Sequence, residues 1–202
     1  MKLVCLDLEG VLIPEVWVGL AELSGLKELR KTTRTEPDYE KLMDWRIGFL
    51  KEHNLTINDI NRVLDELHPL DGAKEFLDEL RSLVQVVILT DSFEDYLKPL
   101  MRQLGYPMCF ANSLVINKET GMIEDFTMRD HDGKRKAIEH FRAMGCEVFA
   151  SGDSYNDLPM VLNADHGCLF KAPDNILEEY PDLRNAHSYD EFLGFIKDSL
   201  DL

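Results

Sequence analysis

The chemistry-bearing residues of this chain gather directly after short apolar segments. Asp7 and Glu9 follow the first such segment, within the stretch DLEGV. Residues 90–92, with the sequence TDS, follow a second segment, and Asp153 follows a third in the stretch GDSYND. If these segments are neighbouring parallel strands, their carboxyl ends meet at one edge of a sheet. We therefore expect several carboxylates, a hydroxyl and exposed backbone N–H groups to converge on one crevice.

Such a cluster of carboxylates repels itself. Like charges in a partly buried site raise the pKa of carboxyl groups and cost stability unless a cation lies among them. A hard divalent ion with oxygen ligands fits, and Mg²⁺ fits best if a phosphate supplies further oxygens. The alternative is that Asp7, Thr90 and Asp153 are turn and helix-cap residues. Three polar strand ends together favour the metal and phosphate site.

Each residue type has a place in phosphoryl transfer. An ionised carboxylate at Asp7 can attack an electrophilic phosphorus and form an aspartyl phosphate. Glu9, on the same side of an extended chain, can protonate the leaving oxygen and then deprotonate the acceptor. Thr90 offers a hydroxyl to phosphoryl oxygens, and the backbone N–H groups around Asp91 and Gly10 offer an anion nest.

Further residues can complete this chemistry. Lys134, at the start of a predicted helix, could neutralise the charge that the phosphate shares with the nucleophile. Spacing alone does not choose it over Arg135 or Lys136. Asp153 would complete the metal site, with Asp157 one turn later as a ligand or as a support for one.

The composition restricts the partners that such a crevice can serve. The 202 residues suit an α/β domain with an inserted subdomain, and their formal net charge is -16. A surface of this charge repels nucleic acid and anionic membranes, so neither is an expected partner. An anionic small molecule must be held by local groups.

The four cysteines and six histidines show no metal-ligand or redox-motif spacing. The chain has no signal-peptide pattern, and no apolar run approaches the ~20 residues of a membrane helix. We expect a cytoplasmic protein whose cysteines are reduced.

Strand-like and helix-like segments alternate along most of the chain. We expect strands at residues 3–6, 84–89, 147–150 and 166–170, and helices at residues 72–83, 96–104, 134–144, 158–164 and 189–202. This alternation predicts an α/β fold with a doubly wound parallel sheet.

Two segments depart from the alternation. Residues 14–69 have helical periodicity without a convincing strand and are too long for a crossover, so they predict a helical cap subdomain. The α/β catalytic core would then comprise residues 1–13 and 70–202. Residues 112–126 alternate around a KETG turn and predict a small β-hairpin.

Four motifs resemble those of the haloacid dehalogenase-like phosphohydrolases. DLEGV resembles the first motif, ILTDS the second, GKRKAI the lysine motif and GDSYND the acidic fourth motif, in order along the whole core. The resemblance implies a Rossmann-like core in which Asp7 is the nucleophile, Thr90 binds phosphate and Lys134 is the lysine of the third motif. It also implies that Mg²⁺ is bound by Asp153, by the Asp7 side chain and by the backbone carbonyl of Glu9.

The inserted cap and the hairpin before the lysine resemble the phosphoserine phosphatase branch of this family. Within that branch, the stretches CLDLEGVLIPE, TTR (residues 32–34), PDY (37–39) and PLMRQLG are similar to those of the bifunctional phosphoserine phosphatase/homoserine phosphotransferases. Most of the family has Asp at the position of Glu9, whereas the bifunctional group resembles this chain in having Glu. We also expect Asp91, Lys134 and Asn156 to belong with Thr90 to the substrate site.

Two charged residues of the predicted cap are candidates for binding an amino acid. Arg46 lies on an apolar helix face, where it could hold a substrate carboxylate or else pair with Glu40 or Asp44. Glu15 could hold the substrate ammonium or be an ordinary first-turn residue. The branch resemblance favours the binding roles, because that branch reads its substrate with a Glu and an Arg at these motif positions.

These features predict a magnesium-dependent phosphatase acting on L-phosphoserine through an aspartyl phosphate at Asp7. The phosphoryl group would pass to water or to homoserine, in serine and threonine metabolism, and the longer side chain of Glu9 could favour the alcohol. One alternative is a phosphatase for another small phosphoester, such as a phosphosugar or pyridoxal phosphate. An alternative of another class is a non-enzymatic magnesium-binding receiver-like module. The oligomeric state stays open, with a homodimer as one option.

Overall fold

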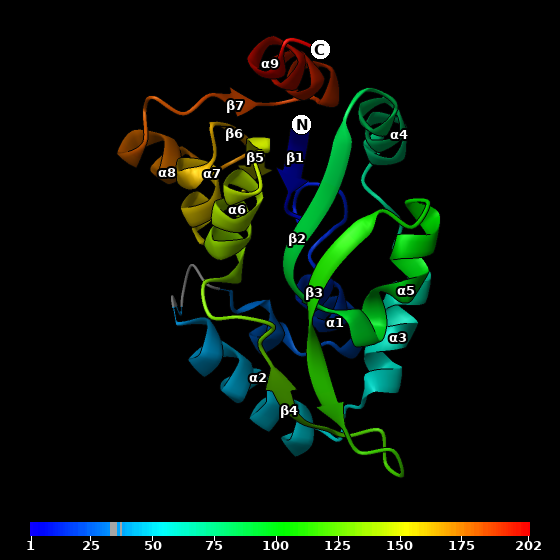
Figure 1. The fold of residues 1–202 in the computed structure, drawn as a ribbon. Helices are drawn as coiled ribbons and strands as arrows, with labels where there is room; N and C mark the ends of the chain where they lie inside the picture. The colour runs from blue at the N-terminus through cyan, green and yellow to red at the C-terminus, as the bar shows by residue number, and fades with distance from the viewer. Residues whose placement is uncertain (33–35, 37) are drawn as a thin grey trace.

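The computed structural model describes residues 1–32, 36 and 38–202. Most of the TTR motif and the proline of PDY therefore lie outside the described residues. The described part of the chain forms a sheet between two layers of helices. A further group of helices lies beyond the carboxyl ends of the strands (Figure 1). No helix in these described ranges has the length and apolar character needed to cross a membrane.

The sheet has its first strand in the middle. Its order is β4-β3-β2-β1-β5-β6-β7, and all neighbours are parallel except β3 and β4, which form the antiparallel hairpin. After β1 the chain builds the sheet toward one edge and later returns to add β5 on the other side of β1. Ligand crevices in such sheets lie beyond the carboxyl ends of the strands at this reversal. The strands are β1 (Lys2–Leu6), β2 (Gln85–Phe93), β3 (Met108–Ile116), β4 (Ile123–Thr127), β5 (Glu147–Gly152), β6 (His166–Phe170) and β7 (Asn185–Ala186).

Helices cover both faces of the sheet because the central strand is apolar on both. Val4 and Leu6 point to one face, where α4, α5 and α9 pack, and Leu3 and Cys5 point to the other, where α6, α7 and α8 pack. All four side chains are buried. These helices are α4 (Ala73–Leu83), α5 (Glu94–Gln103), α6 (Gly133–Ala143), α7 (Leu158–Asn163), α8 (Asp174–Glu179) and α9 (Tyr189–Leu200).

The helices between β1 and α4 lie beyond the carboxyl ends of the strands (Figure 1). They are α1 (Val16–Ser24), the 3-10 helix η1 (Lys27–Arg30), α2 (Tyr39–Glu52) and α3 (Ile57–Glu66). The hairpin supports them, since the Ile57 N–H donates to the Gly121 carbonyl at 2.9 Å and Lys51 Nζ donates to the Glu124 carbonyl at 3.1 Å. The division into a core and a cap at residues 14 and 69 stays a prediction.

The structure corrects several predicted boundaries. The second motif does not follow its strand but forms the end of it, because β2 runs to Phe93 with an irregular register after Leu89. The hairpin pairing at Ser113–Thr127 agrees with the predicted 112–126, but its first strand begins earlier, at Met108, where it pairs with β2 as a parallel core strand. The sequence reasoning also missed β7 and α8, which are two and six residues long.

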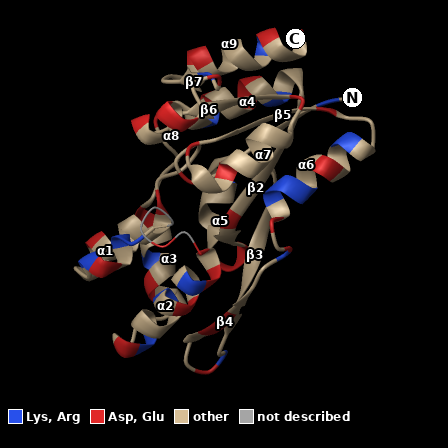
Figure 2. Cartoon of the chain, turned by 90° about the vertical axis from the view of Figure 1, so that its left-hand side faces the viewer, with Lys and Arg blue, Asp and Glu red and all other residues tan. Residues whose placement is uncertain are grey.

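Acidic side chains are spread over the outer helices, including α2, α8 and α9 (Figure 2). Most of the net charge of -16 therefore faces solvent. A smaller group of carboxylates points inward from the strand ends, and these form the candidate site.

Candidate active site

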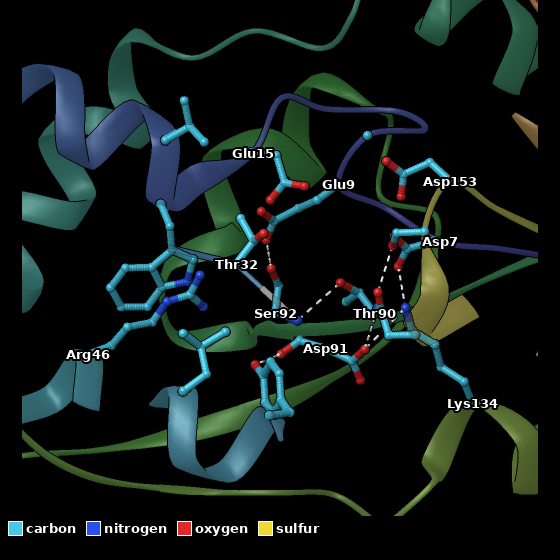
Figure 3. A pocket seen from close by; sticks show the side chains of 17 residues that line it. Asp7, Glu9, Glu15, Thr32, Arg46, Thr90, Asp91, Ser92, Lys134 and Asp153 are labelled. Atoms are coloured by element: carbon cyan, nitrogen blue, oxygen red, sulfur yellow. Dashed lines mark hydrogen bonds and ion pairs between the residues drawn. The ribbon is translucent and has the colours of Figure 1, made fainter. Parts of the chain in front are cut away.

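A cavity of about 310 Å³ lies between the carboxyl ends of the central strands and the helices α1 and α2 (Figure 3). Trp17, Val18 and Leu42 contribute an apolar wall from the helices. Nine of the ten sequence-predicted site residues line the cavity, and the tenth, Asp157, lies buried behind it. The nine are Asp7, Glu9, Glu15, Arg46, Thr90, Asp91, Lys134, Asp153 and Asn156.

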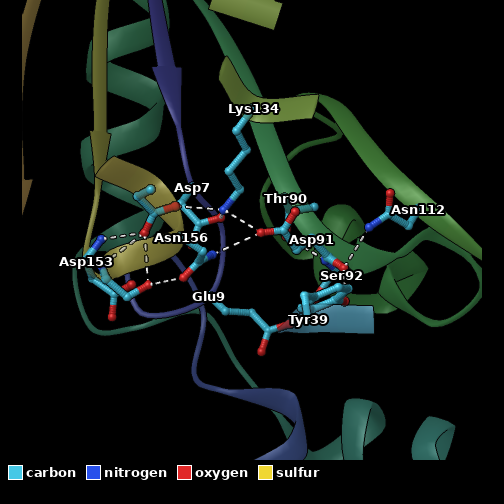
Figure 4. Close-up of polar contacts among 12 residues, drawn as sticks. Asp7, Glu9, Tyr39, Thr90, Asp91, Ser92, Asn112, Lys134, Asp153 and Asn156 are labelled. Carbon is cyan, nitrogen blue, oxygen red and sulfur yellow. Dashed lines mark hydrogen bonds and ion pairs between the residues drawn. The ribbon is translucent and has the colours of Figure 1, made fainter. Parts of the chain in front are cut away.

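Lys134 lies at the centre of the polar end of this cavity (Figure 4). Its Nζ is 2.8 Å from Asp7 Oδ1, 2.7 Å from Asp157 Oδ1 and 3.2 Å from Asp91 Oδ2. Burial by itself would lower the pKa of Lys134, but Asp157, Asp7 and Asp91 outweigh burial and raise the pKa well above its usual value. The ammonium therefore stays charged beside Asp7 and can offset the negative charge of a bound phosphoryl group.

The structure separates Lys134 from its basic neighbours, which spacing could not do. Arg135 forms exposed ion pairs with Asp132 and Glu139 on its own helix. Lys136 pairs with Asp130. Only Lys134 of the three lines the cavity.

Asp157 supports the site from behind. Its side chain is fully buried, and Oδ2 accepts the backbone N–H groups of Asp153 at 3.0 Å and Ser154 at 3.1 Å, while Oδ1 accepts from Lys134. A Cβ on Gly152 would lie 2.1 Å from Asp157 Cγ, so the carboxylate can occupy this place only beside a glycine. With both oxygens engaged, Asp157 orients Asp153 and Lys134, which favours the supporting role over that of a ligand.

The acidic residues of the site form a fitting donor set for a hard cation. Carboxylate oxygens of Asp7, Asp153 and Asp157 lie within 4.8 Å of one another. Burial and the charge of Asp157 raise the pKa of Asp7 well above its usual value and that of Asp153 to about 7. A divalent cation beside Asp7 and Asp153 would relieve this repulsion and keep both ionised, and all of the donors are oxygen atoms, as Mg²⁺ requires.

Gly10 makes room for this donor set. Its φ is +77°, and a Cβ at this position would lie 2.3 Å from Asp153 Oδ2. Its own N–H donates to the Ile13 carbonyl at 2.8 Å, so the anion nest expected around Gly10 stays a prediction for the neighbouring N–H groups. The glycine instead lets the loop after β1 pass close to the carboxylate of Asp153.

Glu9 is held at both oxygens. Oε2 accepts the Val16 N–H at the start of α1 at 2.9 Å, and Oε1 accepts the hydroxyl of Ser92. Burial, followed by the charge of Glu15, raises the pKa of Glu9 to about 8. At neutral pH this carboxyl group therefore carries a proton that it can donate to a leaving oxygen.

The polar residues of the site that were not predicted include Tyr39, Asn112 and Ser92. The Asp91 carbonyl accepts from the Tyr39 hydroxyl at 2.6 Å and from Asn112 Nδ2 at 3.0 Å, which fixes the end of β2 (Figure 4). Ser92, the third, holds Glu9 and donates its N–H to Thr90 Oγ1 at 3.1 Å. Ser92 had a signal in sequence, since Thr90 and Ser92 share one face of an extended strand. Tyr39 was singled out only as part of the PDY stretch, and Asn112 acts through a tertiary contact that has no local signal.

Arg46 does not pair with Glu40 or Asp44. It is only 5% exposed, its Nη2 donates to the Lys31 carbonyl at 2.9 Å and its guanidinium stacks over Trp17 at 4.3 Å. Among the described residues, its Nε is the one buried side-chain nitrogen or oxygen that has no hydrogen-bond partner. Burial lowers the pKa of Arg46 but leaves a guanidinium charged at neutral pH.

Glu15 lies at the N-terminus of α1 without capping it. It precedes the first helical residue, Val16, and none of its side-chain oxygens accepts a helix N–H. The side chain is exposed and lines the cavity near Glu9 (Figure 3). Its position therefore leaves the carboxylate available to a ligand.

Comparison with known proteins agrees with this geometry. A family model described as haloacid dehalogenase-like hydrolase matches residues 1–165. The chain belongs to this family. All four motifs of the haloacid dehalogenase-like hydrolase pattern lie within the matched residues, and their strand-end positions are those of the cavity described above. Membership of a hydrolase family argues against a non-enzymatic receiver-like module.

Two curated relatives are similar over nearly the whole chain. The phosphoserine phosphatase of Pseudomonas syringae pv. tomato is 46% identical over 98% of this chain and 84% of the relative. The phosphoserine phosphatase ThrH of Pseudomonas aeruginosa is 44% identical over 100% of both chains. A solved substrate-bound phosphoserine phosphatase complex superposes with a TM-score of 0.77 at 23% identity, covering 93% of each chain, which shows the shared fold of this hydrolase family.

Proposed function

We propose that this protein is a magnesium-dependent phosphoserine phosphatase that forms an aspartyl phosphate at Asp7. The two curated relatives named phosphoserine phosphatase, which match 98% and 100% of this chain, support the substrate. The observation that carries the proposal within the structure is Arg46, whose buried Nε lacks a partner among the described residues on the wall of the cavity that holds Asp7. A buried guanidinium donor costs stability unless a ligand satisfies it, and an amino acid carboxylate is a suitable acceptor.

The cavity suits a phosphorylated amino acid at both ends. Lys134, Thr90 and Asn156 supply a cation and polar hydrogens at the strand ends, where the phosphoryl group would lie. Arg46 and Glu15 lie on the side of the cap helices and present the opposite charges that an amino acid carboxylate and ammonium require. A phosphosugar offers no partner for this pair of charges, which disfavours that alternative.

The proposed reaction uses the residues in the places where they lie. Asp7 Oδ attacks phosphorus while Lys134, Thr90 and Asn156 hold the phosphoryl oxygens. Glu9 donates its proton to the serine oxygen as the bond from that oxygen to phosphorus breaks. The resulting carboxylate then takes the proton of the acceptor, whose oxygen attacks phosphorus and releases the Asp7 carboxylate. Mg²⁺, held by Asp7, Asp153 and the Glu9 backbone carbonyl, would offset the charge of the phosphoryl oxygens.

We also propose homoserine as a second acceptor, as the resemblance to the bifunctional group implies. The alcohol would take the place that serine leaves, with its hydroxyl beside Glu9 and its amino acid moiety on Arg46 and Glu15. Both acceptors are small molecules. The four free cysteines support the proposal of a cytoplasmic enzyme.

The test of this function is incubation with phosphoserine, Mg²⁺ and homoserine, followed by separate measurement of free phosphate and phosphohomoserine. Phosphoserine-dependent release of phosphate supports the phosphatase, and phosphohomoserine supports the transferase. A panel of phosphosugars and pyridoxal phosphate serves as the control. Faster turnover of a panel member than of phosphoserine would contradict the proposed substrate.

A further inference from the structure

The Asp91 carboxylate occupies donors that the proposed function assigns to phosphate. Its Oδ2 is 3.2 Å from Lys134 Nζ and accepts from Asn156 Nδ2 at 3.0 Å. Both donors line the cavity, and so does Asp91 itself (Figure 4). A negatively charged group at this place is unexpected in a phosphate site, because it repels a phosphate dianion and neutralises the cation that should attract one.

Three carboxylates surround the ammonium group of Lys134. Its Nζ donates hydrogen bonds to Asp7 Oδ1 at 2.8 Å and to Asp157 Oδ1 at 2.7 Å, and Asp91 Oδ2 forms an ion pair with it at 3.2 Å. A phosphoryl oxygen that binds Lys134 must therefore compete with one of these carboxylates. Asp157 is fully buried with both oxygens engaged, and Asp7 is the attacking group.

Asp91 is the carboxylate that can withdraw. Its contact with Lys134 is the longest of the three, and its side chain is 30% exposed, compared with 7% for Asp7 and 0% for Asp157. Its backbone stays fixed meanwhile, because the carbonyl accepts from Tyr39 and Asn112. A second cavity of about 270 Å³ lies beside the first and is also lined by Asp91, which gives the carboxylate space to turn into.

We propose that the Asp91 carboxylate is an internal competitor for phosphate, which replaces the phosphoryl group on Lys134 and Asn156 when the site is empty. The inference rests on the proposed function. The competition weakens the binding of inorganic phosphate, the product of hydrolysis, and thereby promotes its release. Asp91 is thus a positioning residue that acts through Lys134 and Asn156.

The test compares the affinity of inorganic phosphate for the Mg²⁺-loaded wild type and for Asp91→Asn, by calorimetry and as a competitive inhibition constant. Asp91→Asn keeps the shape and removes the charge, so we expect phosphate to bind about tenfold more tightly, or about 1.4 kcal/mol. Asp91→Ala, which also removes the oxygen from the two donors, should tighten binding at least as much. Asp44→Asn, an exposed position on α2, is the control for net charge.

Structural damage would weaken phosphate binding, so a gain in affinity separates the proposal from a merely structural role. Unchanged or weaker phosphate binding in both variants overturns the proposal, and so does an equal gain in Asp44→Asn. A wild type that hydrolyses phosphoserine while the Asp91 variants show no gain refutes this inference alone. A wild type that neither hydrolyses phosphoserine nor binds phosphate refutes the proposed function as well.

Discussion

The role of Arg46 can be tested by removing the substrate group that it is proposed to bind. Phosphoethanolamine keeps the phosphate and the ammonium of phosphoserine but lacks the carboxylate. Arg46→Ala should therefore reduce kcat/KM for phosphoserine and leave the lower kcat/KM for phosphoethanolamine almost unchanged. The difference between the two substrates isolates the contact with the carboxylate from other consequences of the substitution.

The magnitude follows from Arg46 Nε, which has no hydrogen-bond partner in the part of the chain that the structure describes. A hydrogen bond to a charged group contributes about 1.5–3 kcal/mol, and each 1.4 kcal/mol corresponds to about a tenfold change. One such bond predicts a loss of roughly 10- to 100-fold in kcat/KM for phosphoserine. The substitution also removes the bond to the Lys31 carbonyl and the stacking on Trp17, and these losses should lower stability. A loss of folded protein would reduce the rates on both substrates by the same factor.

The assay measures phosphate release from both substrates at saturating Mg²⁺, with thermal unfolding of each variant measured in parallel. Arg30→Ala is the matched control, because Arg30 is an exposed cap arginine paired with Glu22. An equal fall in kcat/KM for phosphoserine and phosphoethanolamine leaves the preference for phosphoserine unchanged, and this result would return Arg46 to a structural role.

Two further predictions concern the loop after β1. Gly10→Ala should displace the Asp153 carboxylate and so abolish the rise in melting temperature that Mg²⁺ gives the wild type. Gly145→Ala is the control, because Gly145 has a similar φ of +82° and a Cβ added there would meet no described atom within 4 Å. This variant should keep the rise in melting temperature. Equal Mg²⁺ responses in the two variants would contradict the assigned metal site. Glu9→Asp should raise the ratio of free phosphate to phosphohomoserine, because the shorter side chain cannot keep its bonds to Ser92 and Val16 and reach the acceptor. An unchanged product ratio would show that side-chain length does not select the acceptor.

The part of the fold that repeats a simple pattern was predictable from the sequence. The apolar runs of β1, β5 and β6 are short, buried on both faces and bounded by polar residues, and their predicted bounds differ from the observed ones by at most two residues. The parallel half of β3 was missed because the sequence of the whole strand is mixed. Polar Asn112 and Ser113 lie in the middle of β3 and interrupt its apolar residues. The two-residue β7 is too short to show a periodicity.

The strand-end part of the site was predictable for a geometric reason. Parallel strands that neighbour one another bring their carboxyl ends together, so Asp7, Thr90 and Asp153 had to lie close once the strands were identified. The contacts that fix these groups depend on packing between distant segments. The bond from Tyr39 to the Asp91 carbonyl joins residues 52 positions apart, and no local pattern announces it.

The choice between alternatives needed the structure. Sequence left Lys134, Arg135 and Lys136 equivalent, and only the fold shows that Lys134 points to Asp7 while the others pair with carboxylates outside the cavity. In the same way, sequence allowed Arg46 to pair with a neighbouring carboxylate. Its burial with an unpartnered Nε among the described residues became visible only from the packing of α1 against α2.

The most direct test of the mechanism is to trap the covalent intermediate. The enzyme is mixed with phosphoserine and Mg²⁺, quenched in acid within the first turnover and analysed by peptide mass spectrometry. We predict that the mass of one phosphoryl group is added to the peptide that contains Asp7, and that Asp7→Asn shows neither the added mass nor turnover. Turnover by Asp7→Asn, or a phosphoryl group on another residue of a fully active enzyme, would contradict nucleophilic catalysis by Asp7.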